Sequence, residues 1–128
     1  MWNTKTPGIP DEFFDRDEGV PITKEEVRVV QISKARLKPG MIVYDIGCGS
    51  GSISVEAALQ VEDSGHVHAV DNDTKAIELT KKNLAKFGVR NVSIINKDAN
   101  KAISDLPKAD AIFIGGTGKD TKEIVKLC

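Results

Sequence analysis

Short apolar runs alternate with longer amphipathic stretches along most of this chain. Four runs rich in β-branched residues are typical of buried strands and cover residues 41–46, 66–70, 91–95 and 109–114. Stretches with apolar residues at helical spacing predict helices at 23–37, 52–61, 74–87, 101–106 and 120–127. This alternation favours βαβ units, so we expect an α/β, Rossmann-like fold with a parallel sheet of four strands and flanking helices.

The first part of the chain differs from the rest. It is polar and acidic and is interrupted by three prolines, which disfavour a long helix. We therefore expect an N-terminal arm over residues 1–22 that lies across a domain formed by residues 23–128. Thr23 and Glu26 have the spacing of a capping box, which predicts that the first long helix begins at Thr23.

Composition excludes several classes of protein. A hydrophobic share of 40% and a charged share of 29% are ordinary for a globular domain, and a net charge of −1 provides no basic field for nucleic acid or an anionic membrane. The chain has no run of about 18 apolar residues and no signal-peptide pattern at its start. Cys48 and Cys128 are too few for a disulfide framework, so we expect reduced thiols in a cytoplasmic protein.

A glycine-rich turn joins the first predicted strand to the following helix. It contains Gly47, Gly49 and Gly51 and is preceded by Asp45 on the strand. Glycines allow a sharp turn and close approach of a ligand, and the N-terminus of the helix presents free N–H groups. The turn therefore predicts a cofactor site, although an ordinary tight strand-to-helix turn also uses glycine.

Acidic and amide residues end the next two strands. Asp71 follows Gly51 by twenty residues and can accept hydrogen bonds from both ribose hydroxyls of an adenosine, with Asn72 beside it. Asp98, followed by Ala99, ends the third strand and is a candidate acceptor for an adenine amino group. The alternative functions are a helix N-cap for the first pair and a surface turn for the second.

The spacing of the glycines separates two classes of cofactor. A dinucleotide fingerprint requires a third glycine where this chain has Ser52. Asp45 would repel a pyrophosphate, whereas it would attract the ammonium group of a methionine, directly or through water. The pattern therefore favours S-adenosylmethionine over NAD.

The chain resembles a known family over roughly residues 9–126. Asp45 to Gly51, Asp71 and Asp98 resemble motifs of class I methyltransferases in general. The segments 8–14 and 19–28 and the Gly115–Gly118 turn resemble the decarboxylating precorrin-6Y and cobalt-precorrin methyltransferases of cobalamin biosynthesis. The resemblance implies methylation of carbon 15 of a precorrin, with decarboxylation of an acetate side chain. It also implies a homo-oligomer.

The same resemblance implies a substrate with many carboxylates. Gly115, Gly116, Thr117 and Gly118 form a candidate nest of amides for one carboxylate, and Arg16 is a candidate partner for another. Lys24 and Arg28 are candidates of the same kind, and the alternative for each of these three cations is a solvated surface charge. We assign no catalytic residue and no metal ligand, because the sulfonium is already an activated methyl donor and no metal-ligand spacing is present.

Two expectations follow from the four predicted strands, since class I methyltransferases have seven. The chain resembles the first half of such an enzyme, and the strand at 109–114 should be an edge with unpaired backbone groups. The alternatives to the precorrin reaction are a class I methyltransferase with another small-molecule or protein substrate, and a cofactor-binding fragment without activity.

Overall fold

The computed structural model describes residues 2–115 and 122–126 and shows one sheet of five strands. The strand order is β3-β2-β1-β4-β5, and the first four strands are parallel. Their bounds are β1 Ile42–Ile46, β2 His66–Asp71, β3 Val92–Asn96, β4 Ala111–Gly115 and β5 Lys122–Lys126. The predicted Rossmann-like α/β fold with four parallel strands is confirmed.

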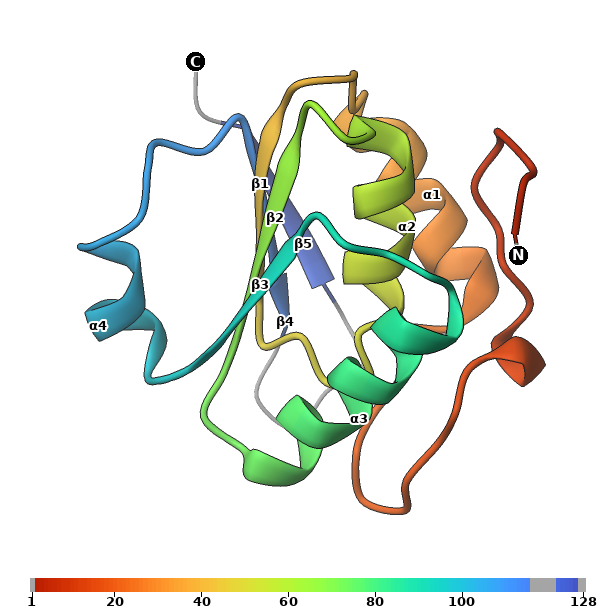
Figure 1. Cartoon of the computed structure of the whole chain (residues 1–128), viewed down its shortest axis with the longest axis horizontal. Helices are drawn as coiled ribbons and strands as arrows, with labels where there is room; N and C mark the ends of the chain where they lie inside the picture. The colour runs from red at the N-terminus through yellow and green to blue at the C-terminus, as the bar shows by residue number, and fades with distance from the viewer. Residues whose placement is uncertain (1, 116–121, 127–128) are drawn as a thin grey trace.

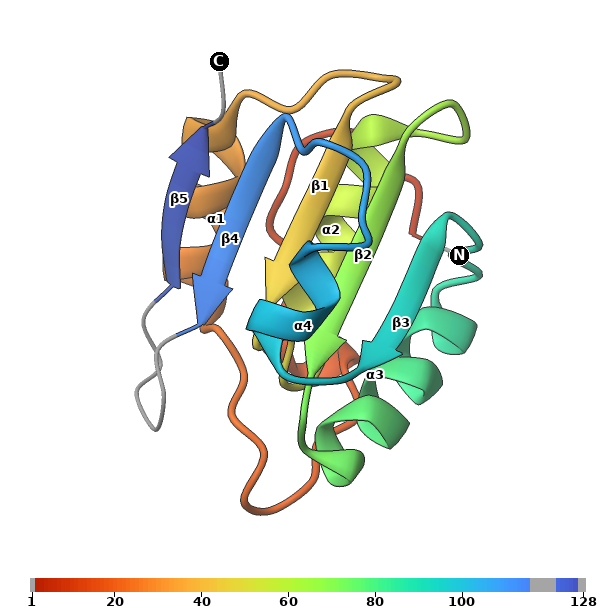
Figure 2. The same cartoon turned by 90° about the vertical axis from the view of Figure 1, so that its left-hand side faces the viewer.

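Helices cover the two faces of the sheet unequally. Three long helices pack on one face, while one short helix lies on the other (Figures 1 and 2). They are α1 Glu25–Ala35, α2 Ser52–Val61 and α3 Thr74–Lys86 on the first face and α4 Ala99–Ile103 on the second; a short 3-10 helix, η1 Asp11–Phe13, lies in the arm. No helix of the described residues is long and apolar enough to cross a membrane.

Alternation along the strands explains the main core. Val43, Val67 and Phe113 occupy the helix-facing positions of β1, β2 and β4 and are fully buried. They pack against Ile32 of α1 and Ile53 of α2. Burial of apolar area drives this packing at roughly 25 cal/mol per Å².

The arm contributes a second cluster of buried residues. Ile9, Phe14 and Ile22 pack against Leu84 and Phe87 at the end of α3. The arm runs along the outer side of the helical layer (Figure 1), and it turns back below the ends of β4 and β1 (Figure 2). The described arm residues, 2–22, therefore pack against the helical layer through these buried side chains.

A buried ion pair anchors the arm. The Nε atom of Arg28 donates to Oε2 of Glu56 at 2.6 Å, and both side chains are almost completely buried. The guanidinium also donates to the carboxylate of Asp11 and to the carbonyl oxygens of Thr23 and Ile9. Arg28 is thus committed to an internal network, so its candidate role as a substrate cation is wrong.

The same network accounts for an error at the first helix. The helix begins at Glu25, its N-cap residue is Lys24, and no side chain caps it, so the predicted capping box is wrong. Arg28 instead binds the carbonyl oxygen of Thr23 at 2.8 Å. This contact holds Thr23 between the arm and the first helical turn.

The end of the chain departs most from expectation. Residues 122–126 form β5, antiparallel to β4, where a helix over 120–127 was predicted. The β4 backbone would otherwise have unpaired N–H and C=O groups, and a strand satisfies them whereas a helix does not. The prediction that β4 is an open edge is therefore wrong for the described residues.

Candidate functional site

The candidate residues gather where the parallel strands end. After β1 the chain builds β2 and β3 on one side, and it then returns to place β4 on the other side of β1. Ligands of open α/β sheets bind in the crevice at such a topological switch point, outside the carboxyl ends of the strands. The glycine-rich loop after β1 and Gly115 at the end of β4 face this point.

Two glycines of the loop are required by the segments packed against them. At Gly49 φ is 56°, and a Cβ atom would lie 2.9 Å from the carbonyl oxygen of Pro21. At Gly51 φ is 85°, and a Cβ atom would lie 2.9 Å from Cγ2 of Thr80. A side chain at either position would displace the arm or α3, so these glycines serve close packing as well as the turn.

Gly47 lies against the end of β4. Its φ is 73°, and a Cβ atom there would lie 3.5 Å from the Cα atom of Gly115. The predicted cofactor loop and the start of the predicted substrate turn therefore meet at the switch point. Gly116, Thr117 and Gly118, the rest of that predicted turn, lie outside the described residues.

Asp45 lies in β1 beneath the loop and is completely buried. Its Oδ2 atom accepts a hydrogen bond from Oγ of Ser54, in the first turn of α2, at 2.7 Å. The positive end of the α2 dipole favours a carboxylate at this depth. The structure thus places a buried carboxyl group directly under the loop, joined to the first turn of α2.

Asp71 ends β2 with its carboxylate held by two backbone amides. The amide of Gly49 donates to Oδ2 at 3.1 Å, and the amide of Asp73 donates to Oδ1 at 2.9 Å. The cap of α3 is Asp73, whose side chain accepts from the amide of Lys75. Asp71 is therefore not used as the helix cap, and its partly exposed carboxylate remains at the switch-point edge.

The ends of β2 and β3 are also connected. The Nδ2 atom of Asn72 donates to Oδ1 of Asp98 at 3.1 Å, and both residues are exposed. Asp98 is the N-cap residue of α4, which begins at Ala99. The structure therefore brings the predicted adenosine-binding residues, Asp71, Asn72, Asp98 and Ala99, to one edge of the sheet.

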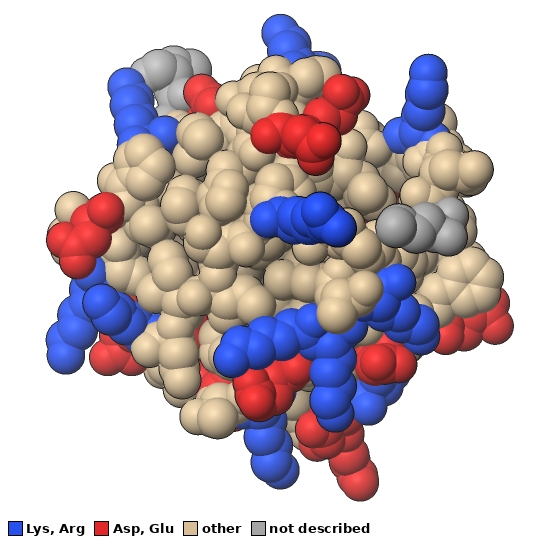
Figure 3. All heavy atoms as spheres, viewed as in Figure 1, with Lys and Arg blue, Asp and Glu red and all other residues tan. Residues whose placement is uncertain are grey.

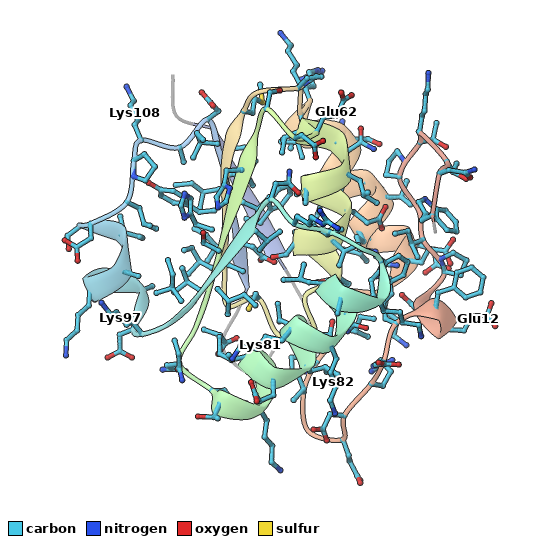
Figure 4. All side chains as sticks on the ribbon, in the orientation of Figure 1. Glu12, Glu62, Lys81, Lys82, Lys97 and Lys108 are labelled. Atoms are coloured by element: carbon cyan, nitrogen blue, oxygen red, sulfur yellow. The ribbon has the colours of Figure 1, made fainter. Side chains whose placement is uncertain are left out.

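Arg16, the predicted partner of a substrate carboxylate, lies between the arm and α3. Arg16 is exposed in a hollow of about 430 Å³ between the arm and α3. Lys75 and Lys82 line the hollow with it, as do three carboxylates: Asp15, Asp17 and Glu78. Cationic and acidic side chains are interspersed across the face shown in Figure 3, and Lys82 lies on α3 (Figure 4). The hollow is thus of mixed charge.

The sequence interpretation missed two residues of α3. Thr80 and Asn83 are completely buried, and their side chains hydrogen-bond the carbonyl oxygens of Gly49 and Ser50 in the loop. Two polar residues three positions apart on the inward face of a predicted helix were the available signal. A buried polar group needs a partner, and the loop backbone supplies it.

Shifted pKa values occur on the face of the sheet that α1, α2 and α3 do not cover. Burial raises the pKa of Tyr44, whose hydroxyl donates to the carbonyl oxygen of Pro107. Burial lowers the pKa of His68, and the charge of nearby His66 lowers it further. Both histidines lie in the amino-terminal half of β2, away from the loop. Among the described residues no cluster of three or more potential ligands suits a metal ion.

Comparisons with known proteins agree on one family. Residues 12–128 match the precorrin methyltransferase domain. A probable cobalt-precorrin-6B C(15)-methyltransferase (decarboxylating) from Pyrobaculum calidifontis is 51% identical over 98% of this chain, and its counterpart from Saccharolobus solfataricus is 51% identical over 97%. The chain spans 65% and 63% of the lengths of these two relatives.

Solved structures give the same result. The crystal structure of precorrin-6y C5,15-methyltransferase from Geobacter metallireducens superposes with a TM-score of 0.80 at 38% identity, covering 88% of this chain and 59% of that one. A precorrin 8W decarboxylase from Methanobacterium thermoautotrophicum superposes with a TM-score of 0.79 at 33% identity, covering 86% and 59%. The sequence match, the fold and the loop at the switch point lead to one conclusion: the chain belongs to the precorrin methyltransferase domain family.

Proposed function

We propose that this protein binds S-adenosylmethionine and transfers its methyl group to carbon 15 of a precorrin in cobalamin biosynthesis, with decarboxylation of an acetate side chain. The observation that carries the proposal is the Asp71 carboxylate, held by the Gly49 amide at the switch point. The names of the relatives support the substrate and the reaction.

The described residues fit this cofactor. Each carboxylate oxygen of Asp71 accepts one amide hydrogen bond and retains capacity to accept another, as the two hydroxyls of a ribose require. Gly47 and Gly115 leave backbone without side chains at the meeting point of β1 and β4, which suits close approach of a ligand. Asp98 offers an acceptor to an adenine amino group.

The charge of the site distinguishes the sulfonium cofactor from a dinucleotide. Asp45 is buried beneath the loop, so it favours the cationic methionine end through its field and disfavours a pyrophosphate. When bound, the cofactor supplies an activated methyl group on a sulfonium. The protein has to hold donor and acceptor in line and exclude water, and alignment alone can contribute about 7–11 kcal/mol to such a step.

The substrate contacts and the remaining features of the whole protein belong to the same proposal. We assign carboxylates of the precorrin to residues Gly115 to Gly118 and to Arg16. We divide the chain into an N-terminal arm over residues 1–22 and a cofactor-binding domain over residues 23–128. We also propose that the protein is a cytoplasmic homo-oligomer, as the family resemblance implies.

Calorimetric titration with S-adenosylmethionine tests the cofactor site. We expect saturable binding by the wild-type chain and a loss of about 1–3 kcal/mol in Asp71→Ala, the usual cost of removing a charged hydrogen-bond partner. The matched control is Asp63→Ala, an exposed aspartate in the turn after α2, which should bind like wild type. Absence of binding by the folded chain would contradict the proposal, and binding without precorrin turnover would support the fragment alternative.

A further inference from the structure

Asn83 connects the arm to the glycine-rich loop from inside the molecule. Its side chain, completely buried in α3, accepts from the amide of Asp15 at 2.7 Å and donates to the carbonyl oxygen of the same residue at 3.1 Å. The same Nδ2 atom donates to the carbonyl oxygen of Ser50 at 2.8 Å. One carboxamide therefore binds two segments that are far apart in the sequence.

The pairing requires an amide at position 83. Asp15 presents both a donor and an acceptor, and Ser50 presents a second acceptor. A carboxylate would face two carbonyl oxygens without a proton to donate, and an apolar side chain would leave all three backbone groups unpaired. Asparagine satisfies them with one acceptor and two N–H donors.

The loop is held from two sides at this point. On the α3 side, Oγ1 of Thr80 donates to the carbonyl oxygen of Gly49 at 2.9 Å. On the arm side, the amide of Ser50 donates to the carbonyl oxygen of Pro21 at 3.2 Å. The amide of Gly49 binds the Asp71 carboxylate. The position of this carboxylate therefore depends on the contacts that α3 and the arm make with the loop.

We propose that Asn83 is a positioning residue for the cofactor site: by fixing the arm at Asp15 against Ser50, it sets the loop conformation in which the Gly49 amide orients Asp71. This role rests on the proposed function, because its consequence is affinity for S-adenosylmethionine. It assigns the arm a part in cofactor binding through its contacts with the loop and with Asn83.

The test compares Asn83→Ala with Asn91→Ala. Asn91 is a matched control because its Nδ2 atom also donates to backbone carbonyl oxygens, those of Ala58 and Glu62, but at the opposite end of the sheet. In the cofactor-free proteins, amide hydrogen exchange at Gly49 and Ser50 should become about tenfold faster in Asn83→Ala only, the factor expected for loss of the one hydrogen bond that Asn83 makes to the loop. The dissociation constant for S-adenosylmethionine should rise by a similar factor in that variant alone.

The possible outcomes separate the two proposals. Unchanged hydrogen exchange at Gly49 and Ser50 would overturn the role of Asn83. Exchange that rises equally in β1 and β2 would also overturn it, because loss of a residue with a merely structural role destabilises the whole domain. A wild-type chain that binds no cofactor would contradict the proposed function, while hydrogen exchange would still decide whether Asn83 holds the loop. If Asn83→Ala does not fold, Asn83→Ser gives the same test, because its shorter hydroxyl side chain keeps a polar group but cannot bridge Asp15 and Ser50.

Discussion

The amide of Gly49 donates to the carboxylate of Asp71 across the ends of β1 and β2, at 3.1 Å. The loop and the acidic residue are therefore joined by a direct hydrogen bond. A hydrogen bond to a charged acceptor is stronger than one between neutral groups, so a change in either residue should shift the other.

Replacing Asp71 by Asn should separate charge from geometry. The amide oxygen of Asn can still accept from Gly49, but the side chain loses its charge, and its NH2 group faces the amide of Asp73, which is also a donor. We expect a fold like wild type by circular dichroism and an affinity for S-adenosylmethionine about tenfold lower by calorimetry. Asp63→Asn is the control, and equal affinities of the two variants would contradict the assignment of Asp71.

A side chain at Gly51 should destabilise the domain more than one at Gly19. Both glycines have positive φ, 85° and 89°, so alanine costs roughly 1–2 kcal/mol at each from backbone strain. At Gly51 the new Cβ would also lie 2.9 Å from Thr80, whereas nothing lies within 4 Å at Gly19. Overpacking raises the expected total for Gly51→Ala to about 2–4 kcal/mol in urea unfolding. Equal losses of stability in Gly51→Ala and Gly19→Ala would show that α3 moves aside to accommodate the new Cβ atom.

Removing the buried guanidinium should cost more than removing an exposed ammonium. Arg28→Met leaves the carboxylates of Glu56 and Asp11 without their partner, so we expect a loss of about 3–5 kcal/mol in the free energy of unfolding. Lys81→Met breaks the exposed pair with Glu78, whose side chains are both 59% exposed, and should change stability by less than about 0.5 kcal/mol.

A second variant tests the reason for the loss at Arg28. The double variant Arg28→Met/Glu56→Leu no longer buries the Glu56 charge, so it should recover part of the lost stability. A double variant less stable than Arg28→Met would show instead that Glu56 contributes mainly through its bonds to the amides of Gly8 and Ile9.

Stability should fall as the pH decreases through the range in which histidine titrates. Burial, with a smaller effect of His66, lowers the pKa of folded His68 below 6.5, so the unfolded chain takes up the proton first. The contribution of neutral His68 is therefore complete above about pH 6.5 and is lost progressively as the pH falls to the folded pKa. Urea unfolding at about pH 8 and about pH 5 measures this loss, which His68→Phe should reduce; the same pH dependence in that variant would assign it to other groups.

The sequence by itself determined the elements that depend on local pattern. Apolar runs rich in β-branched residues produced the four parallel strands, because such side chains favour an extended backbone and pack well on a sheet. Glycines between a strand and a helix located the loop, and Asp71 followed at the spacing of an adenosine-binding acid. These features follow from backbone conformation and from the two periodicities of regular structure.

Only the tertiary structure decided which polar groups are paired and with what. Arg28 had the pattern of a solvated cation, yet the arm buries it against Glu56, because a guanidinium can satisfy several acceptors at once. Residues 122–126 were predicted to be part of a helix, yet they pair with β4, whose backbone groups required a partner. Asn83 received no role from the sequence, because its three backbone partners become neighbours only when the arm and the loop pack against α3. Such pairings join residues distant in the chain, and no local periodicity encodes them.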